Sequence, residues 1–133
     1  MNYLLDTNIC IYIIKRKPLE VLDKFRRISL QRIGVSSITL AELAYGVAKS
    51  RFPEKNHDAF FRFIMPITLV PFDVEDTRYY GQICHQLRSE GTPIGQMDML
   101  IAAQALRHDS ILVTNNTREF ERIPELRLEN WVT

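Results

Sequence analysis

The sequence predicts a three-layer α/β/α fold, with helices on both faces of a central, mainly parallel sheet of four or five strands. Short apolar segments of strand length alternate along the chain with longer segments whose apolar residues recur at helical spacing. Such alternation is typical of βαβ units, because parallel neighbouring strands need a crossover, and the crossover is right-handed. With 46% hydrophobic residues in a chain of 133, we expect residues 1–133 to form one domain.

The first part of the chain predicts one strand and two helices. Tyr3–Leu5 is a short apolar run, as expected of a buried strand. Thr7 is positioned to cap a helix that is apolar on several sides and closes at Lys15–Pro18. Pro18 suits the first turn of a second helix, which carries Phe25 among its apolar residues.

The middle of the chain predicts two further strands and the helices between them. Ile33–Val35 is the second strand, and a helix from about Thr39 to Lys49 follows it, with its apolar residues in one stripe. Pro53 opens another helix, because proline is well tolerated in a first helical turn. Ile67–Val70 is the third strand.

The last part of the chain predicts three helices and the remaining strands. Asp73 caps a long helix that ends at Gly91, and a second helix follows Gly95. Ile111–Val113 is the fourth strand. A polar turn, a short helix and a small last strand at Leu126–Leu128 complete the chain.

Charge and composition exclude few functions. A net charge of +1 neither requires nor excludes a nucleic acid, because a local basic patch can coexist with an acidic pocket. The chain has no apolar run near the ~18 residues of a membrane span and no start typical of a signal peptide. We therefore expect a cytoplasmic protein without a membrane partner. Cys10 and Cys84 lie in apolar segments and predict buried core thiols.

Acidic and small polar residues follow three of the predicted strands. In an open parallel sheet, ligands bind beyond the carboxyl ends of the strands, so these residues should meet at one edge. A further carboxylate, Asp98, lies near the start of an otherwise apolar helix. The residues after the strands are Asp6, Thr7 and Asn8, then Ser36, Ser37 and Glu42, and finally Thr114 and Asn116.

The carboxylates of this group predict a metal site. Clustered carboxylates repel one another and are costly to remove from water. A divalent cation relieves both costs, and hard oxygen ligands favour Mg²⁺ or Mn²⁺. Such a site can activate water for attack on a phosphodiester and can stabilise the leaving oxygen. We expect Asp6, Glu42 and Asp98 to be the ligands.

Each of these residues also has a structural alternative that the sequence leaves open. Asp6 could cap the first helix. Thr39-x-x-Glu42 has the pattern of a capping box, in which Glu42 bonds to the backbone N–H of Thr39. Asp98 could stabilise the positive end of its helix, and Asn116 could be a turn residue.

Four basic residues are candidates for contact with an RNA backbone. Arg118 and Arg122 follow the fourth strand and are the better placed for phosphates. Lys15 and Arg16 close the first helix, where basic residues are commonly no more than a solvated helix end. The sequence contains no glycine-rich phosphate loop and no HExxH or GxSxG motif.

Four stretches of the chain resemble the VapC toxins of the PIN-domain family. LLDTNICIYIIK is similar to the start of those toxins, with Asp6 as their first acid. SSITLAELAYGVAKS and GTPIGQMDMLIAAQAL resemble the second and third motifs, with Glu42 and Asp98 as the acids. LVTNNTREFERIPELRLENW resembles the last motif and the C-terminus. The four stretches occur in the right order and span nearly the whole chain.

The resemblance implies a PIN fold and a Mg²⁺- or Mn²⁺-dependent endoribonuclease. It implies a toxin that inhibits translation until a VapB-type antitoxin neutralises it. Such toxins are usually homodimers that form larger assemblies with antitoxin and bind promoter DNA through it. Relatives with a similar pattern cleave initiator tRNA in the anticodon stem-loop, which is the favoured substrate. The implied catalytic residues are Asp6, Glu42, Asp98 and Asn116, with Thr7, Asn8, Thr114 and Glu119 as possible supporting residues.

The last motif departs from the family pattern at Asn116. Many PIN domains place a fourth acid just after the fourth strand, whereas an asparagine brings an oxygen ligand without charge. Glu119, one turn later, is positioned to compensate. We therefore expect one well-held metal and leave a second open.

Other classes of protein remain as alternatives. One is a non-catalytic interaction module in which the acids are caps. A second is an aspartate-based phosphotransfer domain, although the DxDxT pattern and a clear later lysine are missing. A flap-type nuclease would need more chain than 133 residues. For the antitoxin we expect a partly apolar groove on the first helices, near Tyr12 and Phe25.

Overall fold

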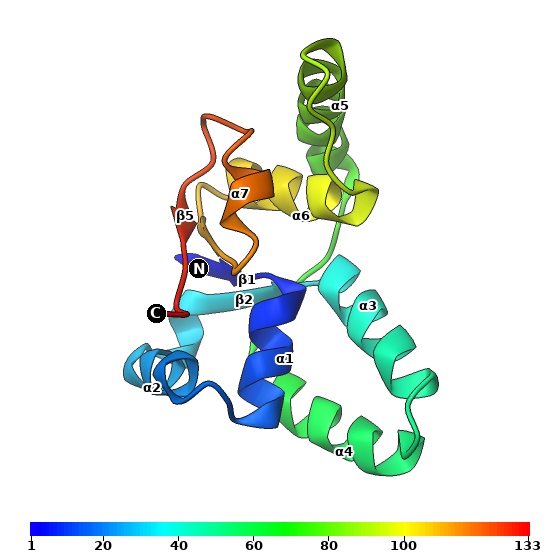
Figure 1. Cartoon of the computed structure of the whole chain (residues 1–133), viewed down its shortest axis with the longest axis vertical. Helices are drawn as coiled ribbons and strands as arrows, with labels where there is room; N and C mark the ends of the chain where they lie inside the picture. Colours follow the sequence, from blue (N-terminus) through cyan, green and yellow to red (C-terminus); the bar gives the residue numbers. More distant parts are fainter.

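The structure, a computed structural model, describes residues 1–133 and contains a five-stranded parallel sheet with helices on both faces (Figure 1). The strand order is β3-β2-β1-β4-β5, so the first strand lies in the middle. The predicted α/β/α fold is confirmed. The strands are β1 (Tyr3–Leu5), β2 (Ile33–Ser36), β3 (Thr68–Val70), β4 (Ile111–Val113) and β5 (Leu128–Glu129).

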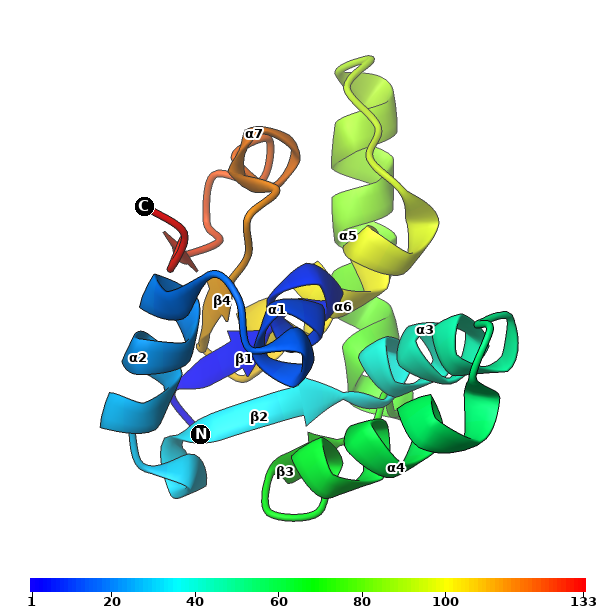
Figure 2. The ribbon, with the colours of Figure 1, turned by 60° about the horizontal axis from the view of Figure 1, so that its bottom comes forward.

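Two groups of helices cover the two faces of the sheet (Figure 2). A short 3₁₀ helix, η1 (Leu30–Arg32), which the sequence pattern did not predict, precedes β2. The first group is α1 (Thr7–Lys15), α2 (Leu19–Arg27), α3 (Ser37–Ala48) and α4 (Pro53–Ile64). The second group is α5 (Val74–Ser89), α6 (Gln96–Arg107) and α7 (Thr117–Phe120).

Alternating strand residues fill two separate cores. Leu5 pairs in register with Val35 and Val113, and all three are buried in the core under α1 to α4. Leu4 and Leu112, also in register, are buried on the other face against α5, α6 and α7. Because successive strand side chains point to opposite faces, these short strands anchor helices on both sides.

Two helices, α1 and α3, begin earlier in the chain than predicted. Asp6 caps α1, because its Oδ1 accepts a hydrogen bond from the backbone N–H of Thr7 at 2.8 Å, so Thr7 is the first helical residue and not the cap. Ser36 caps α3, because its Oγ accepts from the N–H of Ile38 at 2.9 Å. The helix predicted from Thr39 therefore starts before that residue.

Three strands also differ from their predicted bounds, and the first of them, β2, extends one residue further, to Ser36. Ile67 is not part of β3, and Leu126 is not part of the last strand, which is Leu128–Glu129. The backbone N–H of Ile67 donates to the carbonyl of Ile64, and that of Leu126 donates to the carbonyl of Ile123. Both residues are buried, but their backbones complete turns instead of pairing with a neighbouring strand.

The cysteines are both free thiols. Cys10 is completely buried, as predicted, and burial raises its pKa well above the ordinary value, so the thiol is unreactive. Cys84 is only partly buried at the edge of the core formed with α5 and α6, which corrects the prediction of full burial. None of the helices has the length and apolar character that crossing a bilayer requires.

Candidate active site

Asp6 lies at the centre of the candidate site, directly after the middle strand of the sheet. Its side chain is 4% exposed, and its Oδ2 accepts a hydrogen bond from Oγ1 of Thr114 at 2.7 Å. Burial raises the pKa of Asp6, its bonds to Thr114 and Thr7 lower it, and the charges of Glu42 and Glu119 raise it again. Asp6 is thus a helix cap and a member of an acidic cluster at once.

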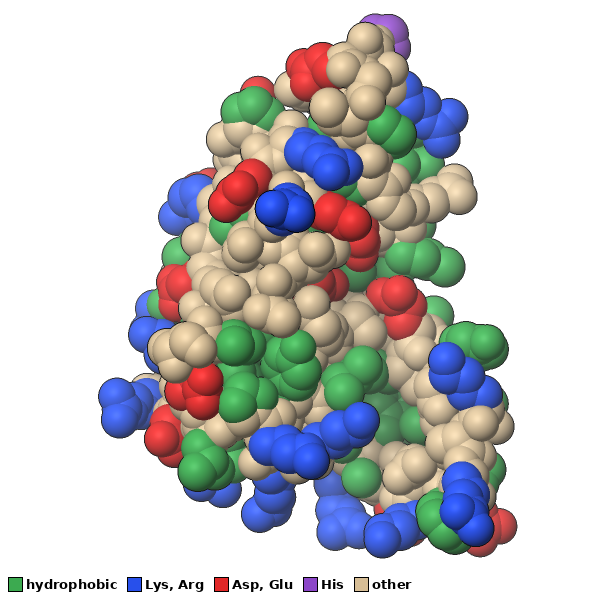
Figure 3. All heavy atoms as spheres, viewed as in Figure 1, with side chains coloured by type: hydrophobic (Ala, Val, Ile, Leu, Met, Phe, Trp, Pro, Cys, Tyr) green, Lys and Arg blue, Asp and Glu red, His purple; other side chains and the backbone are tan.

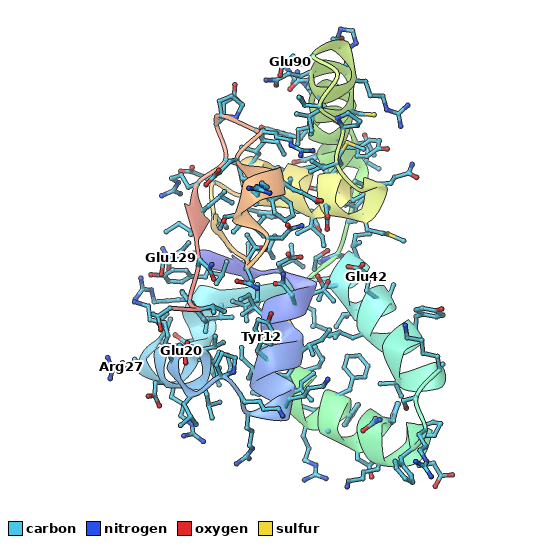
Figure 4. All side chains as sticks on the ribbon, viewed as in Figure 1. Tyr12, Glu20, Arg27, Glu42, Glu90 and Glu129 are labelled. Atoms are coloured by element: carbon cyan, nitrogen blue, oxygen red, sulfur yellow. The ribbon has the colours of Figure 1, made fainter.

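Glu42 reaches from α3 towards α1. The hydroxyl of Thr7 donates to Oε1 of Glu42 at 2.6 Å, and Oγ1 of Thr39 lies 3.2 Å from the same hydroxyl. Because Ser36 caps α3, the capping box of Thr39 and Glu42 is not formed, and that structural alternative is wrong. The contact with Thr7 holds Glu42 near the exit of β1 (Figure 4).

The turn after β4 presents Glu119 to the site. The backbone N–H of Asn116 donates to Oγ1 of Thr114 at 2.9 Å, and Nδ2 of Asn116 donates to Oε2 of Glu119 at 2.9 Å. Asn116 directly precedes α7 but makes no side-chain capping bond there. Its amide therefore orients Glu119 in place of bringing a carboxylate of its own.

Asp98 completes the cluster from the first turn of α6. Burial, followed by the charges of Asp6, Glu119 and Glu42 and a hydrogen-bonding contact with Glu119, raises the pKa of Asp98 to about 7. Asp98 also lies at the positive end of its helix, so it stabilises the start of α6 and belongs to the acidic cluster as well. The four carboxyl groups form one electrostatic cluster. Figure 3 shows that acidic side chains lie singly on this face, while Lys and Arg side chains gather along its lower edge.

The donor set fits a hard divalent cation. Asp6, Glu42, Asp98 and Glu119 offer carboxylate oxygens, and no histidine or cysteine joins them. No three or more of the His, Cys, Asp and Glu side chains have the close spacing of a preformed metal cage. Mg²⁺ usually keeps several waters and is bound through one or two carboxylates. The four side chains therefore supply suitable oxygen ligands but do not surround a preformed metal position.

The basic residues lie at different distances from the cluster. Lys15 and Arg16 are exposed at the end of α1 that is far from Asp6, about 14 Å along the helix axis. Lys15 lines the groove to which Glu42 also contributes, but neither residue contacts Asp6. Arg118 is exposed on α7, next to Glu119. Nη1 of Arg122 donates to the backbone carbonyl of Pro93 at 2.9 Å.

A buried polar contact that the sequence analysis missed fixes α6 against the sheet. Oγ of Ser36 donates to Oε1 of Gln104, and Nε2 of Gln104 donates to the carbonyl of Val70 at 3.1 Å. Ser36 and Gln104 are both fully buried. Because α6 also carries Asp98, this contact sets where that carboxylate lies. The available signal was a single glutamine within the apolar stretch MLIAAQAL.

A groove of about 290 Å³ runs between α1, α3 and α4 and is mainly apolar. Glu42 contributes to its lining, so the groove opens towards the acidic cluster. Tyr12 and Phe25, expected there from the sequence, do not line it, because Phe25 packs against Phe63 in the core and Tyr12 turns towards Asn115. The apolar lining is Ile11, Ile14, Leu43, Val47 and Phe60.

A family match, sequence relatives and solved structures all relate this chain to one family of proteins. Residues 3–126 match the PIN domain family. The chain is 46% identical over 132 residues to ribonuclease VapC2 of Haemophilus influenzae, covering 99% of both chains. It is 42% identical to the tRNA(fMet)-specific endonuclease VapC of Shigella flexneri, covering 98% of both. The structure is similar to VapBC2 of Rickettsia felis bound to a promoter DNA fragment, with a TM-score of 0.92, 41% identity and coverage of 98% and 99%.

Proposed function

This chain belongs to the PIN-domain family as a VapC-type member, and we propose that it is a metal-dependent endoribonuclease, the toxin of a type II toxin–antitoxin pair. The observation that carries the proposal is the cluster of four carboxyl groups at the exits of β1, β2 and β4. It lies where open parallel sheets bind ligands. An interaction module whose acids were simple caps would not need carboxylates from four helices and loops to converge.

We assign Asp6, Glu42 and Asp98 as ligands of one Mg²⁺, for which Mn²⁺ can substitute, with Asn116 as a catalytic residue that also holds Glu119. A cation held there supplies the charge that activates water and stabilises the leaving oxygen of a phosphodiester. Thr7 and Thr114 hold the carboxylates of Glu42 and Asp6 in position. Such supporting hydrogen bonds commonly decide metal affinity.

The favoured substrate is initiator tRNA, cut in its anticodon stem-loop. The similarity to the tRNA(fMet)-specific endonuclease of Shigella flexneri over nearly the whole chain supports this substrate. Its cleavage would inhibit translation, and the protein would act in the cytoplasm, where that tRNA is used. Arg118 on α7 is the basic residue best placed to contact the RNA backbone, and Arg122, Lys15 and Arg16 are more distant candidates.

The partner is a VapB-type antitoxin, by similarity to complexes such as VapBC2 of Rickettsia felis. The apolar groove between α1, α3 and α4 suits a helix of the antitoxin. Because the groove reaches Glu42, a basic side chain of the antitoxin could enter the acidic cluster and displace the metal. We expect a homodimer that forms larger assemblies with the antitoxin and contacts promoter DNA through it. A complex whose antitoxin left the groove empty would contradict this arrangement.

The proposal is tested by RNA cleavage. Purified wild type and Asp6→Asn would be incubated with total tRNA in Mg²⁺ or in EDTA, and the products mapped by primer extension. We expect discrete cuts that require both the metal and Asp6. Asp58→Asn, which changes an exposed aspartate on α4, is the matched control and should cut like wild type. Metal-independent cuts, or equal cutting by Asp6→Asn, would refute the assignment.

A further inference from the structure

Beside the acidic cluster, three polar side chains from distant parts of the chain form a hydrogen-bonded row. Nδ2 of Asn115, in the turn after β4, donates to the hydroxyl of Tyr12 on α1 at 3.1 Å. Nδ2 of Asn130, near the C-terminus, donates to Oδ1 of Asn115 at 3.3 Å. We call Tyr12, Asn115 and Asn130 the polar row. Asn8, one turn before Tyr12, accepts from the backbone N–H of Asn115 at 3.4 Å and fixes the turn.

The polar row begins at the reacting end of the site. Asn115 lies between Thr114, which donates to Asp6, and Asn116, which donates to Glu119. An RNA whose scissile phosphate lies at the acidic cluster would therefore have a neighbouring nucleotide over the row. The row is thus placed to contact the substrate without touching the bond that is cut.

The hydrogen bonds of the polar row contribute little to the stability of the folded protein. Asn115 and Asn130 are exposed, so the two side-chain bonds of the row, at 3.1 Å and 3.3 Å, are open to water. Exchanging such bonds for bonds to water changes the free energy of unfolding little, because the net value of a typical hydrogen bond is only about 1 kcal/mol. The arrangement nevertheless aligns three side chains from three elements on one surface.

The unused hydrogen-bonding groups of the row suit a base better than a phosphate. Tyr12 still has its O–H to donate, and Asn115 keeps one N–H and one lone pair of its amide. Asn130 likewise keeps one N–H and one lone pair, because its Nδ2 donates once, to Asn115, and its Oδ1 accepts once, from Val132. A phosphate needs donors or positive charge, whereas a base edge presents donors and acceptors together.

The charge around the row supports the same choice. None of its three side chains is charged, and the hollow next to Asn130 is lined by more acids than bases. Acids outnumber bases in that lining, and Nζ of Lys24 is paired with Oε1 of Glu129 at 3.9 Å, so the hollow attracts a phosphate backbone little. The acids are Glu20, Asp23 and Glu129, and the bases are Lys24 and Arg27.

We propose that the polar row binds the edge of an unpaired base beside the scissile phosphate and contributes to the choice of cleavage site. Proteins that recognise RNA by sequence do so mainly at unpaired bases, through aromatic side chains and hydrogen bonds to base edges. This inference rests on the proposed ribonuclease function. It assigns selectivity to Tyr12, Asn115 and Asn130, which take no part in holding the metal.

The test measures base preference as well as rate. Anticodon stem-loops of initiator tRNA, each with one loop nucleotide changed, would be cleaved by wild type, Tyr12→Phe, Asn115→Ala and Asn130→Ala. We expect wild type to discriminate at one loop position and the variants to lose about tenfold of that discrimination, the value of a base contact. Tyr12→Phe removes a single oxygen and guards against a folding artefact. Asn2→Ala, another exposed hydrogen-bonded asparagine, is the matched control.

The outcomes separate this inference from the proposed function. Cleavage by wild type with unchanged base preference in all three variants would overturn the inference alone. Unchanged preference combined with escape of the variants from antitoxin inhibition would also overturn it, because the row would then belong to the protein interface. If wild type cleaved no RNA in Mg²⁺, the proposed function would fail and the inference with it.

Discussion

Asp6 uses its two carboxylate oxygens for two different contacts. One carboxylate oxygen caps α1 through Thr7, and the other is fixed by Thr114. Each oxygen uses one acceptor position, so lone pairs remain for a cation. Burial raises the pKa of Asp6, and these two bonds oppose that rise only in part, because they favour the charged form that a metal needs.

Replacing Thr114 by valine should therefore weaken metal binding more than folding. The change keeps the shape of the side chain but removes the donor to Asp6 and the acceptor for Asn116. We expect the pKa of Asp6 to rise further and kcat/KM for RNA to fall about 10–100-fold, as for other residues that orient metal ligands. The loss should shrink at higher Mg²⁺, and Thr114→Ser should restore activity.

Thr77→Val is the matched control for this experiment, because Thr77 makes an exposed hydroxyl contact to its own helix, far from the acids. Steady-state cleavage over a range of Mg²⁺ concentrations gives the apparent metal affinity of each variant. Equal affinity in wild type and Thr114→Val would show that Asp6 needs no such support.

At the scale of elements, strand exits were predictable, whereas helix starts were predictable only where one capping residue had no competitor. Parallel strands end at the same edge, which predicts that Asp6 and Glu42 lie close together, and the structure adds Asp98 from the first turn of α6. The run SSIT offers several capping residues, and propensity does not decide between them. The sequence pattern predicted Thr39 as the cap of α3, with Glu42 bonded to it, but the cap is Ser36 and Glu42 makes no capping bond. Asp73, with no competitor, was predicted correctly as the cap of α5.

The position of α6 should depend on Gln104. In Gln104→Leu, the side-chain volume is nearly kept, but the carbonyl of Val70 and the hydroxyl of Ser36 lose a buried partner. We expect the free energy of unfolding to fall by about 1–3 kcal/mol, the cost of unsatisfied buried polar groups. Because α6 carries Asp98, cleavage by the folded variant should fall as well.

Urea unfolding followed by circular dichroism measures this change. Gln82→Leu, on the exposed side of α5, is the matched control and should change stability by less than about 0.5 kcal/mol. A Gln104→Leu protein as stable as that control would mean that water replaces the lost amide.

Across the whole molecule, the sequence predicted the layers but left the strand order open. Right-handed crossovers fix the hand of each βαβ unit. They do not say whether β4 joins β1 on its free edge or extends the sheet beyond β3, and this choice depends on distant packing. The position of β4 determines which side chains form the candidate site, because the pairing of β4 with β1 brings Thr114 next to Asp6. The fourth carboxyl group, on Glu119, entered the site through the same pairing.

Gathering four carboxyl groups in one place should make the stability of the whole molecule depend on pH and metal. The pKa of Asp98 is about 7 in the folded protein, against 3.8 for the ordinary side chain. Between those values the folded state binds more protons than the unfolded chain, so stability falls as pH rises. The contribution from Asp98 is fully present below pH 4 and is lost by about pH 7. The raised pKa of Asp6 acts in the same direction.

Thermal unfolding in EDTA between pH 4 and pH 8 should show this loss. We expect Asp98→Asn to gain stability relative to wild type across that range and to melt above wild type at pH 8. Mg²⁺ at pH 8 should raise the Tm of wild type, because a ligand that binds only the folded state stabilises it. It should raise the Tm of Asp98→Asn much less. In Asp58→Asn, which leaves the cluster intact, both the pH dependence and the Mg²⁺ effect should match wild type. A constant difference between wild type and Asp98→Asn at every pH would mean that the carboxyl groups do not share one electrostatic site, and the proposed metal ligands would lose their main physical support.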